Sequence, residues 1–179
     1  VIDAKKCIEL GLTGPVLRGS GMPRDLRKDE PYLVYDKLDF NVITFPDGDV
    51  WSRYMVRIEE MKESVKLIYQ ILDMMPKGPV KAMEPKAVLP DKKDVYTKME
   101  DLINDFMLTN FGAQAEPGET YTAIESPKGE LGYFIVADGT GQPWKLKIRA
   151  TSSANLQGLA TMAEGSMIAD IVAIIGSID

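Results

Sequence analysis

The strongest structural signal in the chain is DVWSRYMVRIEEMKESVKLIYQILDMM, residues 49–75. Its apolar and aromatic residues recur at intervals of three and four, the spacing of one face of an α-helix. The members of this stripe are Val50, Tyr54, Ile58, Met61, Val65, Ile68, Leu72 and Met75. Asp49 can cap the helix, and Pro76 followed by Gly78 ends it. We therefore predict a long core helix that buries this stripe.

Two arginines flank the stripe. Arg53 and Arg57 are one helical turn apart, where they could bind an anion or a neighbouring carboxylate. We expect them to form a solvated or ion-paired flank of the helix.

Shorter helical patterns lie on both sides of this element. Residues 3–10 predict a helix that Asp3 caps and Gly11 stops. A second pattern starts at Asp91 or Asp94 and ends at Gly112. Its predicted buried face consists of Val95, Met99, Leu102, Ile103, Phe106 and Met107. Residues 155–163 and 166–175 predict two more helices, separated by Gly165.

Between these helical parts the periodicity changes to two. Residues 119–125, 130–137 and 143–149 predict three strands with short connections rich in turn residues, which favour an antiparallel meander. The fold class is therefore α+β, with long core helices, a three-stranded meander and C-terminal helices. We expect a single domain over residues 1–179, helical over 1–112, β over 119–149 and helical again over 154–176.

The segment Thr13–Gly21 has three glycines and one proline in nine residues. This composition predicts a loop without a regular element, with backbone that needs positive φ or a close neighbour. Gly19 and Gly21 lack the third glycine of a dinucleotide-binding turn, and no Gly-Lys-Ser/Thr follows them. The sequence therefore does not support nucleotide binding here.

Composition excludes several chemistries. The 179 residues contain no histidine and one cysteine, Cys7, so the chain cannot build a Ser-His-Asp triad, a histidine-ligated metal site or an iron–sulfur cluster by itself. The net charge of −6 argues against nucleic acid as a partner. The run Met167–Gly176 is too short for a membrane span and contains Asp170. The chain has no initiator methionine and stops soon after its last helix, so we expect a fragment of a longer protein.

Five ordered motifs carry a resemblance to a known family. They are TGPVLRGSG (13–21) with DLR (25–27) and PY (31–32), RYMVRIEEM (53–61), ESPKGELG (125–132), KIR (147–149) with NLQ (155–157), and ADIVAIIGSID (169–179). Together they resemble the C-terminal half of the D subunit of NADH–quinone oxidoreductase, respiratory complex I. That subunit is itself similar to the large subunit of nickel–iron hydrogenases, which implies the fold of the C-terminal part of such a subunit.

The resemblance implies a role without a redox centre or metal in this chain. In the family the subunit packs against a small subunit that holds the terminal iron–sulfur cluster, and quinone is reduced in the crevice between them. Lys128 matches the lysine of the turn that faces the crevice, and Asp179 matches an aspartate at its inner end. Arg18, Gly19 and Ser20 are candidates for another wall. Thr151–Ser153 departs from the family pattern, where a proline and an aromatic are usual.

Further implications concern the assembled complex. NADH is expected to bind at a distant subunit, and the partners are the iron–sulfur subunit, other peripheral-arm subunits and quinone. The complex belongs to the respiratory electron-transport chain as a translocase, with this subunit peripheral at the cytoplasmic face of the inner (plasma) membrane. We expect the fragment alone to be inactive, and its apolar stripe could make it self-associate.

Two other functions stay open at this point. The chain could belong to the large subunit of a membrane-bound nickel–iron hydrogenase, which the residues after Asp179 would decide. It could also be a non-catalytic interaction module, because its ten methionines suit adaptable apolar surfaces.

Overall fold

A computed structural model describes residues 1–82, 84 and 87–178 of the chain. The chain forms two compact units. The first consists of Val1–Met75, Thr122–Gly132 and Ile148–Asp179, and the second of Pro76–Tyr121 and Tyr133–Lys147.

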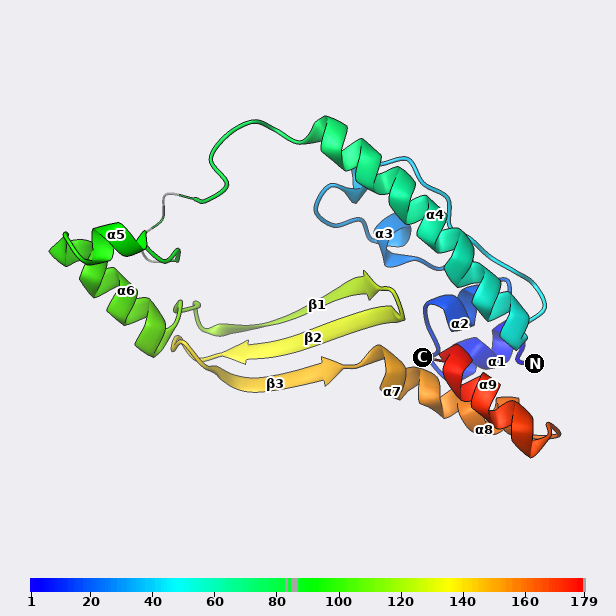
Figure 1. Ribbon diagram of the computed structural model, residues 1–179. Helices are drawn as coiled ribbons and strands as arrows, with labels where there is room; N and C mark the ends of the chain where they lie inside the picture. The colour runs from blue at the N-terminus through cyan, green and yellow to red at the C-terminus, as the bar shows by residue number, and fades with distance from the viewer. Residues whose placement is uncertain (83, 85–86, 179) are drawn as a thin grey trace. The chain divides into compact units, whose positions relative to one another are not determined.

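Helices precede and follow a three-stranded sheet, as Figure 1 shows. The elements before the sheet are α1 (Ala4–Glu9), α2 (Pro15–Arg18), α3 (Leu26–Asp29), a 3₁₀ turn at Tyr35–Lys37, α4 (Val50–Met74), α5 (Lys92–Val95) and α6 (Met99–Phe111). The sheet consists of β1 (Gly118–Ser126), β2 (Gly129–Ala137) and β3 (Pro143–Arg149). After it come α7 (Thr151–Asn155), a 3₁₀ turn at Leu156–Gly158, α8 (Leu159–Ala163) and α9 (Ile168–Ile178). The α+β prediction is confirmed.

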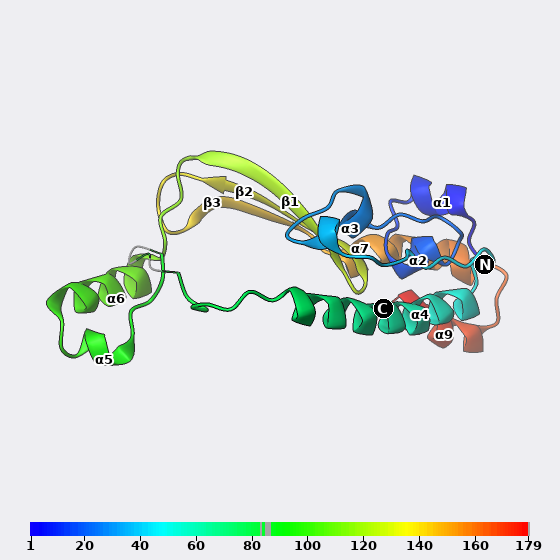
Figure 2. The same cartoon turned by 90° about the horizontal axis from the view of Figure 1, so that it is seen from above.

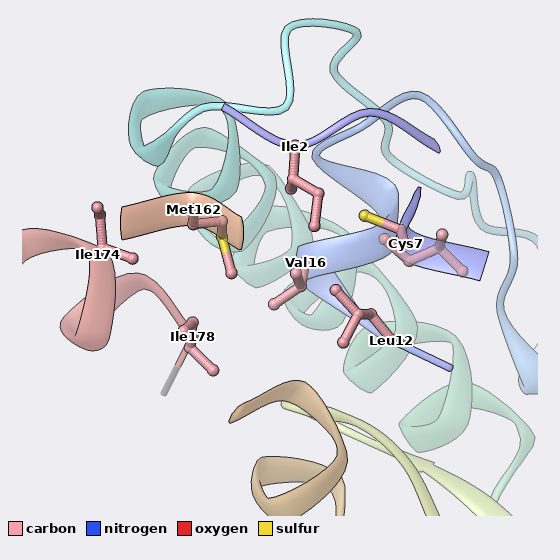
Figure 3. Packing of buried hydrophobic residues seen from close by; sticks show 8 residues of the cluster. Ile2, Cys7, Leu12, Val16, Met162, Ile174 and Ile178 are labelled. Atoms are coloured by element: carbon pink, nitrogen blue, oxygen red, sulfur yellow. The ribbon is translucent and has the colours of Figure 1, made fainter. Parts of the chain in front are cut away.

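The main core of the first unit joins the two ends of the chain. Side chains from α1, α2 and the segment between them pack against α8 and α9 (Figure 3). The cluster consists of Ile2, Cys7, Leu12, Val16, Leu17, Met162, Ile174 and Ile178. Asp3 caps α1 as predicted, since its carboxylate accepts a hydrogen bond from the Lys6 N–H at 2.7 Å. Burial of apolar side chains therefore fixes α2, and with it the start of the glycine-rich segment.

The long helix exists with the predicted ends, but the prediction that its apolar stripe is buried is wrong. Asp49 caps α4 by accepting from the Ser52 N–H, and the helix ends before Pro76. Within the stripe, Tyr54, Met61, Val65, Ile68, Leu72 and Met75 are all exposed. The buried side chains of α4 are instead Ser52, Arg53, Val56 and Leu67. The helix thus turns its more polar side toward the rest of the chain.

The prediction for the two flanking arginines also needs correction. Arg53 is only 1% exposed. Its Nε donates to the Ser177 hydroxyl at 2.9 Å, and its Nη1 donates to the Gly48 carbonyl at 3.0 Å. Arg57 donates to the Ser177 carbonyl at 2.8 Å. Both cations therefore lie at the C-terminal end of α9, where the helix dipole favours positive charge, and Figure 2 shows α9 beside α4.

In the second unit the predicted helix is divided, and its apolar face is exposed. α5 ends at Val95, and α6 begins at Met99 and ends at Phe111, where Gly112, with φ +72°, follows as the cap. The prediction that this helix buries its apolar face is wrong, because most of that face is exposed: Met99, Leu102, Ile103, Phe106 and Met107. No residue that the structure describes in this unit is a fully buried hydrophobic one. The apolar pattern therefore marks a surface here, not a core.

One loop prediction and one helix prediction were partly wrong. The segment Thr13–Gly21 does contain a regular element, the short helix α2, which begins after Gly14 with proline at its first position. Residues 155–163 are not one helix, because α7 begins already at Thr151 and a 3₁₀ turn separates it from α8. The strands β1, β2 and β3 lie in sequence order, as expected for a meander.

A pair of valines on α4 tests which face of the helix is buried. Val56 is 0% exposed and Val65 is 52% exposed. We expect Val56→Ala to lower the free energy of unfolding by about 2 kcal/mol, because it removes buried methyl groups and leaves a cavity. Val65→Ala should stay within about 0.5 kcal/mol of the parent. Urea unfolding followed by circular dichroism measures both, and equal losses would contradict the observed orientation of α4.

Candidate functional site

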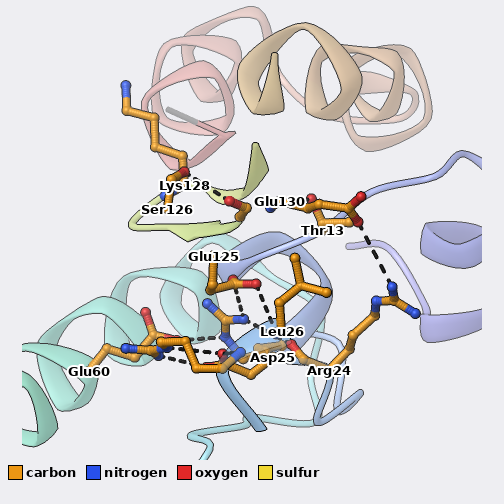
Figure 4. A network of polar contacts seen from close by, with 12 residues as sticks. Thr13, Arg24, Asp25, Leu26, Glu60, Glu125, Ser126, Lys128 and Glu130 are labelled. Atoms are coloured by element: carbon orange, nitrogen blue, oxygen red, sulfur yellow. Dashed lines mark hydrogen bonds and ion pairs between the residues drawn. The ribbon is translucent and has the colours of Figure 1, made fainter. Parts of the chain in front are cut away.

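The turn between β1 and β2 presents Lys128. Pro127 and Lys128 connect the strands. The Ser126 hydroxyl donates to the Gly129 carbonyl at 2.8 Å and accepts from the Lys128 N–H at 3.3 Å. The side chain of Lys128 is exposed and extends away from the buried charges below the turn (Figure 4). The hairpin thus holds one ammonium group on a tightly bonded turn.

The backbone of this turn touches the glycine-rich segment. Gly14 has φ +70°, and a Cβ there would lie 2.5 Å from the Cα of Gly129. A Cβ at Gly129, with φ +126°, would lie 2.7 Å from the Thr13 hydroxyl oxygen. Both positions need glycine because no side chain fits between the two backbones. The Thr13 hydroxyl also accepts a hydrogen bond from the Glu130 N–H at 3.1 Å.

The amide of Asn155 connects α7 to the same two segments. Asn155 is 0% exposed. Its Oδ1 accepts from the Thr13 N–H at 3.1 Å, and its Nδ2 donates to the carbonyls of Thr13 at 3.3 Å and of Lys128 at 3.2 Å. Shortly before α7, β3 ends at Arg149, which donates to the Glu130 carbonyl at 2.8 Å. The start of β2 is therefore bonded to the end of β3 as well as to the glycine-rich segment.

A buried cluster of charges lies on the other side of the turn (Figure 4). Arg18 of α2 is 1% exposed. Its Nε donates to Glu60 of α4 at 2.6 Å, and its Nη1 donates to Glu125 of β1 at 2.8 Å and to the Arg24 carbonyl at 2.9 Å. Glu125 also accepts from the Leu26 N–H at 3.3 Å. A single guanidinium therefore joins a short helix, the long helix and the first strand of the hairpin.

The pKa values of the carboxyl groups in this cluster shift in different directions. Burial raises the pKa of Glu60 and of Glu125 above the usual 4.5, although Arg18 opposes the shift in both. Asp25 is also buried, but its hydrogen bonds to Arg27, at 2.6 and 3.0 Å, outweigh burial and lower its pKa below 3.8. The two carboxylates that share Arg18 thus take up protons more readily than Asp25 does.

A cleft of about 490 Å³ borders the cluster. Its wall includes Arg18, Glu60 and Glu125, together with Ser126 and Pro127, the two residues that precede Lys128. The cleft therefore links the buried charges to the turn within the first unit.

The other sequence-predicted site residues have structural contacts. Gly19 is buried, and a Cβ there would lie 2.9 Å from Cγ of Arg53. The Ser20 hydroxyl is buried and donates to the Leu17 carbonyl at 2.7 Å. Asp179 lies outside the residues that the structure describes. The structure thus brings Arg18 and the Lys128 turn to one region. Gly19 and Ser20 directly follow Arg18 in the chain.

Sequence reasoning missed three side chains that shape this region. Glu60 lies seven residues after Arg53, which places both on the same side of α4. This spacing is visible in the sequence, but a charged helix face is usually solvated, so it did not indicate burial. Glu125 lies within the ESPKGELG motif but carries no spacing signal of its own. Asn155 lies within the NLQ motif, but no local pattern shows its hydrogen bonds, because its partners are 142 and 27 residues away in the chain.

Comparison with known proteins defines the family. The family model described as "Respiratory-chain NADH dehydrogenase, 49 Kd subunit" matches residues 1–179. The match places the chain in one class of subunits of an oxidoreductase. The chain belongs to the family of the 49 kDa subunit of respiratory-chain NADH dehydrogenase.

Similar curated proteins carry consistent names. A D subunit of NADH-quinone oxidoreductase from Chloroherpeton thalassium is 52% identical over 179 residues, covering 100% of this chain and 41% of the relative. The D subunit of the same enzyme from Salinibacter ruber is 49% identical over 99% of this chain and 40% of the relative. That from Geotalea uraniireducens is 49% identical over 100% and 46%. The chain thus spans less than half the length of these relatives.

One finding bears on the membrane. Among residues 1–82, 84 and 87–178, no helix has the length and apolar character needed to cross a bilayer.

Removal of the shared guanidinium should be costly. Arg18→Met leaves Glu60 and Glu125 buried without their cation, so we expect the free energy of unfolding to fall by about 3 to 5 kcal/mol. The matched control is Arg24→Met. The Arg24 side chain is 51% exposed and 3.9 Å from Glu130, so its loss should cost less than about 1 kcal/mol. Urea unfolding measures both variants, and a loss for Arg18→Met as small as the control's would contradict the cluster's structural role.

The raised pKa values predict a pH dependence. A carboxyl whose folded-state pKa is raised contributes stability that is complete below the unfolded pKa, 4.5 here, and is lost as pH rises through the folded value. Glu60→Gln removes one such group, so the fall in the urea midpoint between pH 4.5 and neutrality should be smaller in this variant. Asp25 titrates below 3.8, outside this range.

The control for this pH series is Glu59→Gln. Glu59 pairs with Lys62 at 2.6 Å outside the cluster, so its variant should follow the parent's pH curve. Parallel curves for Glu60→Gln and the parent chain would refute the assignment.

Proposed function

We propose that this chain forms part of the quinone-reduction pocket of an NADH–quinone oxidoreductase, with Lys128 at its margin. The observation that carries the proposal is the Lys128 turn, an exposed ammonium on a hairpin whose backbone is fixed from two sides. The names of the relatives supply the reaction, since they are NADH-quinone oxidoreductase subunits.

The chemistry explains why a lysine suits this place. Reduction of a quinone to a quinol adds two electrons and two protons, and negative charge develops on its oxygens before the protons arrive. An ammonium held beside such an oxygen stabilises that charge without moving during the reaction. Lys128 has this form, because its turn is hydrogen-bonded internally and its side chain points away from the buried cluster below.

The other residues of the pocket are proposed with different roles. Arg18 lines the cleft next to Ser126 and Pro127, so it would set the charge behind the turn. Gly19 and Ser20 would support that wall from inside, since both are buried. Asp179 would border the inner end of the pocket, beyond the end of α9 that Arg57 binds through Ser177.

Electrons would come from outside this chain. We propose that a neighbouring small subunit holds the terminal iron–sulfur cluster, that NADH binds at a distant subunit, and that other peripheral-arm subunits complete the assembly. One cysteine and no histidine leave this chain unable to ligate a cluster alone. Its own contribution to the translocase would be the shape and charge of the pocket, and the fragment alone would be inactive.

The exposed apolar faces support a place in a larger assembly. The stripe on α4 includes Val65, Ile68 and Leu72, all more than half exposed. Contiguous apolar surface of this kind typically marks a contact region. We propose that the chain is peripheral at the cytoplasmic face of the inner (plasma) membrane within its complex, and that the isolated fragment self-associates through this stripe.

A hydrogenase large subunit and a non-catalytic module are the competing functions. Nickel in the full-length protein would indicate the hydrogenase subunit. Failure of the full-length protein and its cluster-bearing partner to bind a quinone analogue, with no nickel present, would indicate the non-catalytic module. The relatives' names favour the quinone reaction over both.

Lys128→Ala tests the proposed function in the assembled complex. We expect quinone reduction to fall at least about tenfold, since removal of one preorganised charge from a reaction site commonly costs this much or more. Oxidation of NADH by an artificial acceptor such as ferricyanide should not change, because that reaction does not use the quinone pocket.

Lys145→Ala is the matched control. Lys145 is an exposed lysine of β3, and its variant should retain parental rates with both acceptors. Parental quinone turnover in Lys128→Ala would overturn the proposed function.

A further inference from the structure

We propose that Asn155 is a positioning residue for Lys128: its buried amide fixes the turn that carries the ammonium, without approaching the substrate itself. The proposal rests on the proposed function, because it assigns Asn155 an effect on quinone reduction that passes through Lys128.

The hydrogen bonds of Asn155 have a common target. Its side chain is 0% exposed, and its three bonds all go to backbone atoms of two segments far from it in the chain. Two of these bonds fix both the N–H and the carbonyl of Thr13. The third holds the carbonyl of Lys128 itself at 3.2 Å. Asn155 therefore sets the distance between the turn and the glycine-rich segment.

Only a primary amide satisfies this arrangement. The site needs one acceptor for the Thr13 N–H and two donors for two carbonyls, which is the inventory of an asparagine side chain. An aspartate would place an acceptor against both carbonyls, and a leucine would remove all three hydrogen bonds. The chemistry of the site thus selects asparagine by its hydrogen bonds, not by its volume.

The glycine contacts make the connection stiff. With Gly14 and Gly129 in backbone contact, the turn cannot move closer to the segment. The bonds from Asn155 to the Lys128 carbonyl and from the Glu130 N–H to Thr13 prevent it from moving away. Contacts thus hold the chain at residues 128, 129 and 130. The Cα of Lys128 is thereby fixed from a buried side, while its side chain stays exposed.

Position matters for a single charge. A displacement of about 1 Å at a reacting centre can reduce a rate by as much as 100-fold. Loss of the Asn155 amide should therefore reduce catalysis when Lys128 is present, and should matter little when the ammonium is already gone. This dependence on Lys128 distinguishes positioning from general support of the fold.

A double-mutant cycle in the assembled complex tests the proposal. The variants are Asn155→Asp, Lys128→Ala and the double variant, assayed for kcat and KM with a soluble quinone and for NADH oxidation by ferricyanide. We expect Asn155→Asp to lower kcat for the quinone at least about fivefold in the parent, and less than about twofold in the Lys128→Ala background. Ferricyanide rates should be unchanged in all three.

The outcomes are distinct. Equal losses from Asn155→Asp in both backgrounds would show a merely structural role and overturn the proposal alone. Full quinone activity in Lys128→Ala would remove the proposed function, and this inference with it. Full quinone activity in Asn155→Asp beside an impaired Lys128→Ala would overturn the inference and leave the proposed function standing.

Two further variants keep the test decisive. Asn110→Asp is the control, because Asn110 is an exposed asparagine that donates to the Phe106 carbonyl within α6. It should behave as the parent. If Asn155→Asp fails to assemble, Thr13→Val takes its place, since it removes the acceptor for the Glu130 N–H with little change in volume. The same dependence on Lys128 is expected, and its absence would count against the proposal.

Discussion

The guanidinium of Arg18 is held out of water by three separate parts of the chain. It bonds Glu60 on the long helix, Glu125 on the first strand and a backbone carbonyl beside α3. A buried cation needs such partners, because desolvation of a charge is costly unless hydrogen bonds and opposite charges replace water. Arg18 therefore keeps its partners in this buried place only where α2, α4 and β1 approach one another. Glu125, which Arg18 binds, lies in β1 just before the turn that carries Lys128.

A second constraint acts on the other side of the hairpin. There the contacts that hold the turn are two glycines in contact, a threonine hydroxyl and the amide of Asn155. The charge cluster fixes where β1 ends, and the amide fixes where the turn lies. Between them an exposed lysine is carried on a turn whose backbone is held on both sides. Such rigidity is what a preorganised charge at a reaction site requires.

Local sequence patterns predicted much of the fold. Caps at Asp3 and Asp49, the stop at Gly112 and the three alternating strands all follow from short-range geometry, and the structure confirms them. The same patterns failed to say which face of a helix is buried. Periodicity shows that apolar residues share a side of α4, but it does not show whether their partner belongs to this chain. Here most of that side is exposed among the described residues, and Ser52, Arg53, Val56 and Leu67 pack inward instead.

The sequence by itself determined the long helix α4, the three strands, the α+β class and the motifs that mark the family, because caps, turns and periodicity depend on neighbours in the chain. It also placed Lys128 on a hairpin turn, since Ser126–Gly129 is a turn sequence between two alternating segments. Only the tertiary structure decided the surroundings of that lysine. Burial of Arg18, the raised pKa of Glu125 and the bonds of Asn155 all arise from residues tens of positions apart. Hydrogen bonding and desolvation depend on distance in space, which no local pattern records.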